Sequence, residues 1–197
     1  MTNIFTEPNW KSYTILSKGP LFNKEECKKI IEIGHSLPPK TAEVGMGKEG
    51  GGVNTNKRTT LISWIPFEMK EAIGMYMKID EFIKRCNVNH FGFDGVCITE
   101  LAQFTEYPLG GFYDWHMDSD TTFGKEPPVR KISMTVLLND PSEFEGGQLE
   151  LMAPGKRPDL IQGQAILFAS FLNHRVAPVT KGIRQSLVMW FGGPPLR

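Results

Sequence analysis

The pattern of apolar and polar positions divides the chain into a helical first part and a β-rich second part. Apolar residues recur at helical spacing in NKEECKKIIEIGHSLPP, which begins at Asn23, and again from Phe67 to Arg85. Asn23 is suited to cap the first helix, and Pro38 and Pro39 end it. The run RTTLISWIP between the two helices is typical of a short strand. We therefore expect two helices separated by a strand.

The apolar positions of the second helix form a single stripe that we expect to pack in the core. Its members are Met69, Ile73, Tyr76, Met77, Ile79 and Phe82. Although the stripe is rich in methionine, a flexible side chain that fills irregular gaps is more simply explained by core packing than by cofactor binding.

A glycine-rich stretch, EVGMGKEGGGVNTNKR, runs from Glu43 to Arg58 and has almost nothing to bury. Such a composition predicts a loop. A phosphate-cradling role is disfavoured, because no strand precedes the glycines and no G-K-[ST] follows them.

After Asn87, short apolar or β-branched runs follow one another, with Gly, Pro, Asn and Asp clusters between them. The runs are GVCITELAQFTEY, KISMTVLLN, GQLELM, GQAILFAS, HRVAPV and RQSLVMWF. At least six strands without intervening helices predict an antiparallel sandwich or barrel. We expect one α+β, mainly β domain over residues 1–197. Residues 1–90 would supply helical support and the glycine-rich loop, and residues 91–197 a jelly-roll catalytic core.

Composition narrows the classes of function. The 197 residues carry 22 basic and 22 acidic side chains, so no net field draws the protein to nucleic acid. Cys27, Cys86 and Cys97 form no C-x-x-C pair, which argues against disulfides or a structural zinc site. No stretch reaches the roughly 18 apolar residues that span a bilayer, and the N-terminus has no signal-peptide pattern. We expect a cytoplasmic protein that does not associate with a membrane.

The candidate chemistry begins in GGFYDWHMDSD, where His116 and Asp118 stand two residues apart. Residues i and i+2 of an extended segment share a face, so both side chains would point to one place. Alone, the pair is equally explained by a capping Asp beside an exposed His. A second histidine, His174, follows the strand GQAILFAS. Two His and one Asp match the facial triad of non-haem Fe(II) oxygenases, although zinc accepts the same ligands.

Ten residues after His174 comes Arg184, and on a strand it would share a face with Ser186. A guanidinium with a neighbouring hydroxyl can hold a carboxylate through charge-assisted hydrogen bonds, which implies a carboxylate cosubstrate. A surface cation on the last strand is the simpler alternative for Arg184 alone. The glycine pair in EFEGGQLEL, Gly146 and Gly147, predicts a turn between strands with a purely backbone role.

These motifs resemble those of a known family. In order they are H-x-D, L-L-N-D-P with E-G-G-x-L-x-L, G-x-A-I-L-F, H-R-V-x-P-V-x-x-G-x-R and a late W. Over about residues 98–192 the chain resembles the prolyl 4-hydroxylase-type Fe(II)/2-oxoglutarate dioxygenases and is most similar to the bacterial PKHD-type hydroxylases.

The resemblance implies a double-stranded β-helix that holds Fe(II) through His116, Asp118 and His174. Arg184 would grip the far carboxylate of 2-oxoglutarate. Tyr107, nine residues before His116, and Ser186 would be further cosubstrate contacts. Leu137 stands near a position where some relatives carry another cosubstrate-binding tyrosine.

The implied reaction is hydroxylation of a C–H bond, with O₂ consumed and 2-oxoglutarate decarboxylated to succinate; ascorbate is compatible as an accessory reductant. A prolyl or other amino-acid residue in a peptide or protein is the leading substrate, and a free amino acid or small molecule is the alternative. We hypothesise that loop 43–58 folds over the substrate, with Arg58 and Trp64 as candidate contacts near its base. Trp64 is equally compatible with a core position.

Three other readings stay open. A cupin-like metal enzyme would use the same triad without 2-oxoglutarate and would have no use for Arg184. A non-catalytic β-sandwich binding module would not bind iron stoichiometrically. Nucleic-acid demethylases share H-x-D and a late His, but they resemble a pattern with a second Arg six residues after the first, where this chain has Trp190. The oligomeric state is left open. His35 and His90 have no place in the proposed site.

Overall fold

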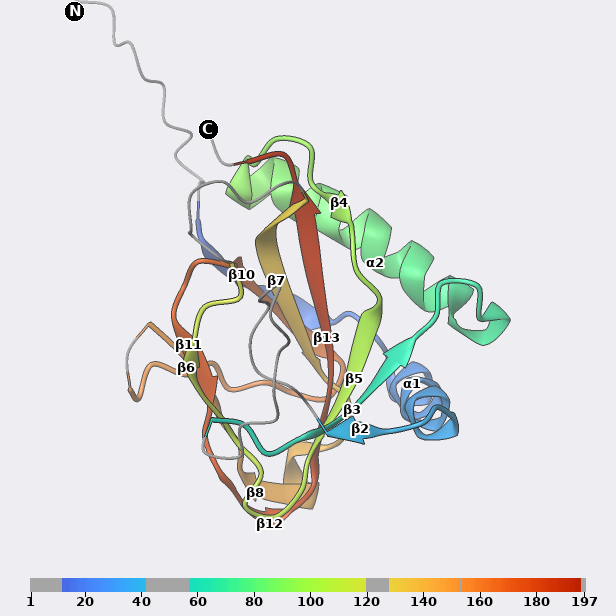
Figure 1. The fold of residues 1–197 in the computed structure, drawn as a ribbon, viewed down its shortest axis with the longest axis vertical. Helices are drawn as coiled ribbons and strands as arrows, with labels where there is room; N and C mark the ends of the chain where they lie inside the picture. Colours follow the sequence, from blue (N-terminus) through green and yellow to red (C-terminus); the bar gives the residue numbers. More distant parts are fainter. Residues whose placement is uncertain (1–11, 42–56, 120–127, 153, 196–197) are drawn as a thin grey trace, which may run out of the picture.

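A computed structural model describes residues 12–41, 57–119, 128–152 and 154–195. Its main layer is an antiparallel sheet in the order β1-β10-β7-β13-β5-β3-β2, with β4 paired to β13 (Figure 1). The strands are β1 Thr14–Pro20, β2 Lys40–Thr41, β3 Leu61–Ile65, β4 Cys97–Ile98, β5 Ala102–Tyr107, β7 Val129–Leu137, β10 Gln164–Ala169 and β13 Arg184–Gly193.

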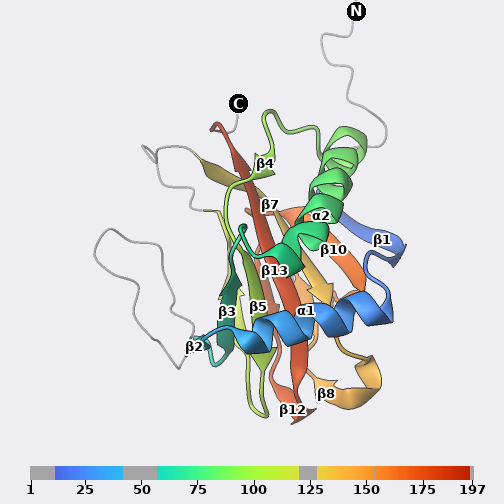
Figure 2. The ribbon, with the colours of Figure 1, turned by 90° about the vertical axis from the view of Figure 1, so that its right-hand side faces the viewer.

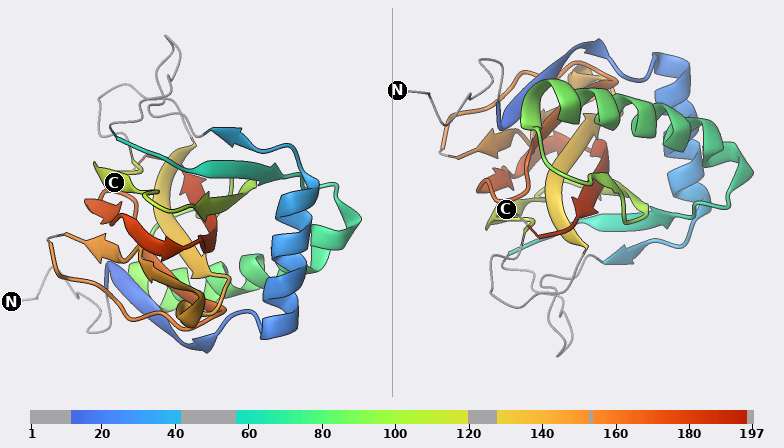
Figure 3. Two further views of the ribbon diagram at one scale, coloured as in Figure 1. Left: turned by 90° about the horizontal axis from the view of Figure 1, so that it is seen from below. Right: turned by 90° about the horizontal axis from the view of Figure 1, so that it is seen from above.

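Shorter strands form a second layer on one side of this sheet, as the views from the two ends of the molecule show (Figure 3). A three-stranded sheet has the order β6-β11-β9, and a hairpin pairs β12 with β8. Their bounds are β6 Tyr113–His116, β8 Phe144–Gly146, β9 Leu149–Leu151, β11 His174–Val176 and β12 Val179–Gly182. This mainly β jelly roll with N-terminal supporting helices confirms the predicted fold class.

Two helices, α1 Lys24–Ser36 and α2 Ile73–Cys86, cover the other side of the main sheet (Figure 2). Asn23 caps α1 as predicted, and it does so in a capping box: Glu26 N donates to Asn23 Oδ1 and Asn23 N donates to Glu26 Oε2, both at 2.8 Å. Short helical segments complete the structure: 3₁₀-helices Lys70–Ala72 and Pro141–Glu143, and a π-helix Asn87–Phe91. No helix in the described ranges is long and apolar enough to cross a membrane.

Strand alternation on β13 divides the molecule into a core side and a site side. Leu187, Met189 and Phe191 are fully buried in the main hydrophobic cluster, which also contains the buried faces of both helices. Burying side chains of this size stabilises the fold by about 1.5–3 kcal/mol each. The alternate positions, including Arg184 and Trp190, face the layer of short strands. The core thus fixes which β13 residues reach the space between the sheets.

The predicted second helix was wrong in its start and in part of its stripe. Because Pro66 and the 3₁₀-helix precede it, α2 begins at Ile73 instead of Phe67, and its buried face is displaced around the axis. Ile73 and Met77 are 46% and 69% exposed. The face that packs inward consists of Met75, Tyr76, Ile79, Ile83 and Cys86.

Several strand boundaries also differ from prediction. The run HRVAPV splits into β11 and β12 around Pro178, which has no N–H for a ladder. GVCITELAQFTEY splits into β4 and β5, and β1 was not predicted, since its sequence TILSKGP lacks a regular apolar alternation. The predicted loop 43–58 lies outside the described residues except for Lys57 and Arg58, so the lid stays a prediction.

Candidate functional site

Strand pairing brings the three predicted metal ligands together. His116 ends β6, and His174, which begins β11, lies directly opposite it in the antiparallel ladder. Asp118 lies two residues after His116. Its Oδ1 is 3.5 Å from His116 Nε2, and its Oδ2 is 3.4 Å from His174 Nε2. One donor atom from each residue lies within 4.8 Å of the others. The three donor atoms are thus close enough to bind one metal ion.

Backbone contacts orient both imidazole rings. His116 Nδ1 lies 2.7 Å from the carbonyl oxygen of Asp114, and His174 Nδ1 lies 3.0 Å from that of Leu172. Since a carbonyl only accepts, each Nδ1 carries a hydrogen and donates it, which leaves Nε2 as the nitrogen that faces Asp118. This is the arrangement in which histidine binds a metal.

Neighbouring groups keep Asp118 ionised although it is buried. Burial opposes its charged form, but His174, His116 and a hydrogen bond from Ser133 lower the pKa of the Asp118 carboxyl below its usual value. Burial is also the main cause that lowers the pKa of His174. Two imidazoles that present Nε2 and one carboxylate form a set that suits Fe(II) or Zn²⁺.

Tyr113 and Arg58 pack over this cluster. The Tyr113 ring stacks on His116, with centroids 3.5 Å apart and an interplanar angle of 16°. Arg58 Cζ lies 4.5 Å from the Tyr113 centroid, and Arg58 Nε donates to Thr60 Oγ1 at 2.7 Å. Arg58 is therefore placed beside the cluster, and its contact with a substrate stays a prediction. Tyr113 was missed, since no spacing rule distinguishes it from the other aromatic residues of its segment.

A groove of about 640 Å³ opens beside Asp118 and has aromatic walls. It is lined by Lys40, Thr41, Arg58, Ile62, Trp64, Glu100, Gln103, Tyr113, Asp118, Arg130 and Trp190. Trp64 is partly exposed and lies in this groove, with its ring centroid 6.1 Å from that of Trp190. The groove position, instead of a core position, is thus the one that Trp64 occupies.

Trp190 carries an unused hydrogen-bond donor in the groove wall. Its side chain is 6% exposed, and Nε1 has no partner among the described residues. Arg130 lies against its ring, with Cζ 4.0 Å from the centroid, and the Glu100 carboxylate accepts two hydrogen bonds from Arg130. Because buried donors are nearly always paired with protein or water, this N–H is available to a water or to a ligand atom.

A second predicted group, Arg184 with Tyr107 and Ser186, also comes together. Arg184 lies opposite Tyr107 in the β13–β5 ladder, and its Cζ is 5.2 Å from the Tyr107 centroid. Nη1 donates to Ser186 Oγ at 3.2 Å, while Nη2 is buried without a partner in the described part of the chain. A guanidinium only 2% exposed, with an open donor, is suited to a carboxylate.

Tyr107 links the second group to the three-residue cluster. A small cavity of about 30 Å³ is lined by the three-residue cluster together with Tyr107, Leu149 and Val176. Gly147 lies beside Arg184: a Cβ there would come within 2.9 Å of Arg184 Cδ. Gly146 ends β8 and Gly147 follows it, with φ of 75° and 64°; the two strands on either side belong to different sheets, so the predicted turn is not a hairpin, and Gly147 also leaves room for the guanidinium.

The remaining histidines lie elsewhere. His35, near the end of α1, has Nε2 2.9 Å from Glu106 Oε1 on the helix side of β5. His90 is in the π-helix Asn87–Phe91. Neither residue contributes to the cluster, as expected.

Comparisons with known proteins agree with this site. A family model described as the 2OG-Fe(II) oxygenase superfamily matches residues 102–192. A PKHD-type hydroxylase of Idiomarina loihiensis is 40% identical over 171 residues, which cover 82% of this chain and 76% of that protein. A PKHD-type hydroxylase of Acidovorax ebreus is 37% identical over 93 residues, 45% of this chain and 41% of that protein. Several curated relatives are likewise matched over only about two fifths of their length.

Solved structures show the same fold. A viral collagen prolyl hydroxylase of Paramecium Bursaria Chlorella virus-1, in a 2OG complex, has a TM-score of 0.69 at 21% identity and covers 92% of this chain and 97% of its own. A prolyl hydroxylase of Trichoplax adhaerens, in complex with a hypoxia inducible factor peptide fragment, has a TM-score of 0.70 at 22% identity, over 92% and 84%. Together with the relative matched over most of its length, the family model places this chain: it belongs to the 2OG-Fe(II) oxygenase superfamily.

Proposed function

We propose that this chain is an Fe(II)- and 2-oxoglutarate-dependent dioxygenase that hydroxylates a C–H bond of a prolyl or other amino-acid residue in a peptide or protein. Hydroxylation would be coupled to decarboxylation of 2-oxoglutarate to succinate. One observation carries the proposal. The His116, Asp118 and His174 cluster shares a small cavity with Tyr107, whose ring flanks the buried Arg184 guanidinium with its open Nη2 donor.

The donor set fits Fe(II). His116 and His174 would bind through Nε2, since their Nδ1 hydrogens are held by backbone carbonyls, and Asp118 would bind as a carboxylate. The bound metal and 2-oxoglutarate would supply the oxidising power for C–H cleavage. The chain supplies orientation: Ser133 and the two carbonyls hold the ligands in place.

Arg184 fits the far carboxylate of 2-oxoglutarate. Ser186 occupies Nη1 and the Tyr107 ring flanks the guanidinium, so Nη2 remains to bind a carboxylate oxygen. Apolar side chains, including Leu149 and Val176, border the space on the way to the metal ligands and would exclude water from the cosubstrate. In a cupin-like enzyme that does not use 2-oxoglutarate, the buried Arg184 guanidinium would have no cosubstrate carboxylate to bind.

The groove beside Asp118 fits a peptide segment. The Trp64, Tyr113 and Trp190 rings offer flat apolar walls for a ring such as that of proline, and Trp190 Nε1 offers a donor to a peptide carbonyl. The peptide-bound prolyl hydroxylase of Trichoplax adhaerens, which shares the fold, supports this substrate class.

Anaerobic titration tests the cosubstrate. Fe(II)-loaded protein is titrated with 2-oxoglutarate, and the visible charge-transfer absorption of a chelated keto acid is followed in wild type and in Arg184→Ala. We expect a band that saturates in wild type and requires far more 2-oxoglutarate in the variant. Bound iron without a band would contradict the proposal and favour the cupin-like enzyme.

The substrate class needs a separate assay. Purified enzyme is incubated with 2-oxoglutarate and either a library of proline-containing peptides or the free amino acids. Mass spectrometry detects the gain of one oxygen atom. Oxygen incorporation into peptides supports the proposal, whereas modification of free amino acids alone would replace it with the small-molecule alternative.

A further inference from the structure

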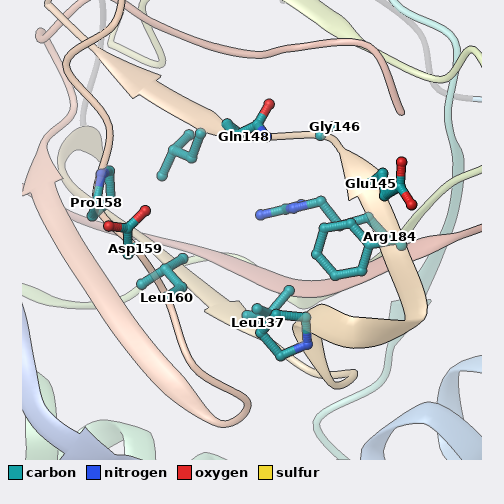
Figure 4. A pocket seen from close by; sticks show the side chains of 12 residues that line it. Leu137, Glu145, Gly146, Gln148, Pro158, Asp159, Leu160 and Arg184 are labelled. Carbon is teal, nitrogen blue, oxygen red and sulfur yellow. The ribbon is translucent and has the colours of Figure 1, made fainter. Parts of the chain in front are cut away.

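Few contacts orient the Arg184 guanidinium itself. Among the described residues, Nη1 donates to Ser186 Oγ, while Nη2 has no partner. Figure 4 shows the side chain reaching into a pocket of about 380 Å³ that Leu137 and Gln148 border. Leu137 has no polar side-chain atom to offer. The direction of the guanidinium therefore depends strongly on the backbone from which it projects.

That backbone lies where the regular pairing of β13 ends. On β5, the partner of Arg184 is Tyr107, the last residue of that strand. On β7, the last pair of the ladder joins Leu137 to Ser186, two residues beyond Arg184. Ile183, just before β13, is 48% exposed. Because the ends of strands open more easily than their middle, strand pairing alone holds this part of β13 weakly.

The side chain of Asn139 continues the pairing past the end of β7. The last backbone bond on this side runs from Leu138 N to the Gln185 carbonyl, at 2.9 Å. Beyond it, Gln185 N donates to Asn139 Oδ1 at 2.9 Å, and Asn139 Nδ2 donates to the Ile183 carbonyl at 2.9 Å. The carboxamide thus bonds to the backbone on both sides of Arg184, as a peptide group of a neighbouring strand would.

Asn139 is itself held in one orientation. It is 4% exposed, and Nδ2 also donates to Glu143 Oε2 at 3.2 Å. Since a carbonyl and a carboxylate only accept and an N–H only donates, these partners fix which end of the amide carries the nitrogen. Glu143 ends the 3₁₀-helix Pro141–Glu143, whose start is capped by Asp140 Oδ1 accepting from Ser142 N at 3.0 Å.

We infer that Asn139 is a positioning residue: its carboxamide holds the start of β13 so that the Arg184 guanidinium meets the far carboxylate of 2-oxoglutarate. The inference rests on the proposed function. A charge-assisted bond between a guanidinium and a carboxylate depends on alignment. Asn139 lines neither the Arg184 pocket, nor the substrate groove, nor the cavity at the metal ligands, so its effect on binding would pass through Arg184.

The test compares two keto acids in wild type and in Asn139→Leu, which keeps a branched side chain of similar size but removes the bonds to the backbone. Anaerobic calorimetry of Fe(II)-loaded protein should show about tenfold weaker binding of 2-oxoglutarate to the variant, the effect of one misaligned bond to a charged group. 2-Oxopentanoate, a keto acid of the same length without the far carboxylate, should bind both proteins equally. Equal loss of affinity for both acids would overturn the positioning role.

Asn87 provides a matched control. Its Nδ2 donates to the Phe93 carbonyl at 2.8 Å, and its Oδ1 accepts from Phe93 N at 3.0 Å. Asn87 lines neither the Arg184 pocket nor the cavity at the metal ligands. Asn87→Leu should therefore lower the free energy of unfolding, measured by urea denaturation, and leave the affinity for 2-oxoglutarate unchanged. The same loss of affinity in both leucine variants would contradict a specific role of Asn139.

Asn139→Asp keeps the inference testable if the leucine variant does not fold. Its protonated carboxyl offers an O–H and a carbonyl in place of the amide, whereas the ionised form cannot donate to the Ile183 carbonyl. Affinity for 2-oxoglutarate relative to wild type should fall between about pH 6 and 8.5 as the new carboxyl ionises, which infrared absorption follows. Ionisation without a change in relative affinity would contradict the inference.

Failure of the inference and failure of the proposed function give different results. Wild type that binds iron but not 2-oxoglutarate would overturn the proposed function itself. Wild type that binds 2-oxoglutarate, with Arg184→Ala weakened and the folded Asn139 variants at wild-type affinity, would overturn only the role of Asn139.

Discussion

The Ser133 hydroxyl on β7 donates a hydrogen bond of 2.6 Å to Asp118 Oδ2, the carboxylate oxygen that also faces His174. A second hydroxyl, that of Ser170, lies 2.9 Å from Ser133 Oγ. Asp118 N donates to the Ser170 carbonyl at 2.9 Å. The carboxylate is thus oriented by strands of the main sheet, although Asp118 itself follows a strand of the small sheet.

We predict that Ser133→Ala weakens metal binding about 10- to 100-fold, the usual effect of removing a group that orients a metal ligand. The dissociation constant is measured by competition with a chelating dye. Ser63→Ala is the matched control, since Ser63 is a buried serine on β3 opposite Phe104, which belongs to the helix-side core. Equal affinities for Ser133→Ala and wild type would show that Ser133 does not orient the ligand.

The clustering of His116, Asp118 and His174 could be predicted from the sequence because the combination of motifs is rare. An H-x-D pair, a late histidine and an arginine on the following strand involve few residue types, and strand alternation already aims the pairs at one face. Ser133 could not be found in this way. Serines are common, and its contact with Asp118 depends on the register of β7 with β10, where Ser133 pairs with Phe168.

In the fold, too, features set by local sequence could be predicted and features set by long-range contacts could not. The capping box at Asn23 is local, so the start of α1 was predicted correctly. The start of α2 depends on how Tyr76 packs: its hydroxyl donates to the Ile65 carbonyl at 2.6 Å and accepts from Ala102 N at 2.8 Å. That long-range contact favours a buried face that adds Met75, Ile83 and Cys86 to the two residues, Tyr76 and Ile79, that it shares with the predicted stripe. A periodicity read from the sequence contains no such contact.

Gly147→Ala should reduce the affinity for 2-oxoglutarate and destabilise the protein. The left-handed backbone costs a non-glycine residue roughly 1–2 kcal/mol. The new Cβ would also lie 2.9 Å from Arg184 Cδ and from Val179 Cγ2, so the guanidinium must move. Isothermal titration and urea denaturation measure the two effects.

Gly155→Ala separates strain from displacement. Gly155 has a similar φ of 78°, but nothing lies within 4 Å of a Cβ at this position. We expect a comparable loss of stability from the backbone and unchanged binding of 2-oxoglutarate. If both variants lost affinity equally, the close approach of Gly147 to Arg184 would not be what positions the guanidinium.

Trp190→Phe should lower the affinity for a peptide substrate several-fold while leaving 2-oxoglutarate binding unchanged. Phenylalanine keeps a ring against Arg130 but lacks the Nε1 donor, which has no partner to lose among the described residues. The KM for an identified peptide and the decay of 2-oxoglutarate without substrate are compared. Trp115→Phe, on the small sheet beside Arg175, is the control. A wild-type KM would remove Trp190 Nε1 from substrate recognition.

The stability of the metal-free protein should fall as the pH decreases below about 6.5. Burial lowers the pKa of His174 from its ordinary value of 6.5, so the unfolded chain binds a proton that the folded chain resists. This contribution is complete above pH 6.5 and is lost as the pH falls toward the folded pKa. Asp118, whose folded pKa is also lowered from its ordinary value of 3.8, acts in the same direction but only at lower pH.

Urea denaturation between pH 7.5 and 5 measures how steeply the free energy of unfolding falls with pH. His174→Gln should make this dependence weaker, and Ser63→Ala should leave it as in wild type. A protein that gained stability on acidification over this range would contradict the burial of a neutral His174.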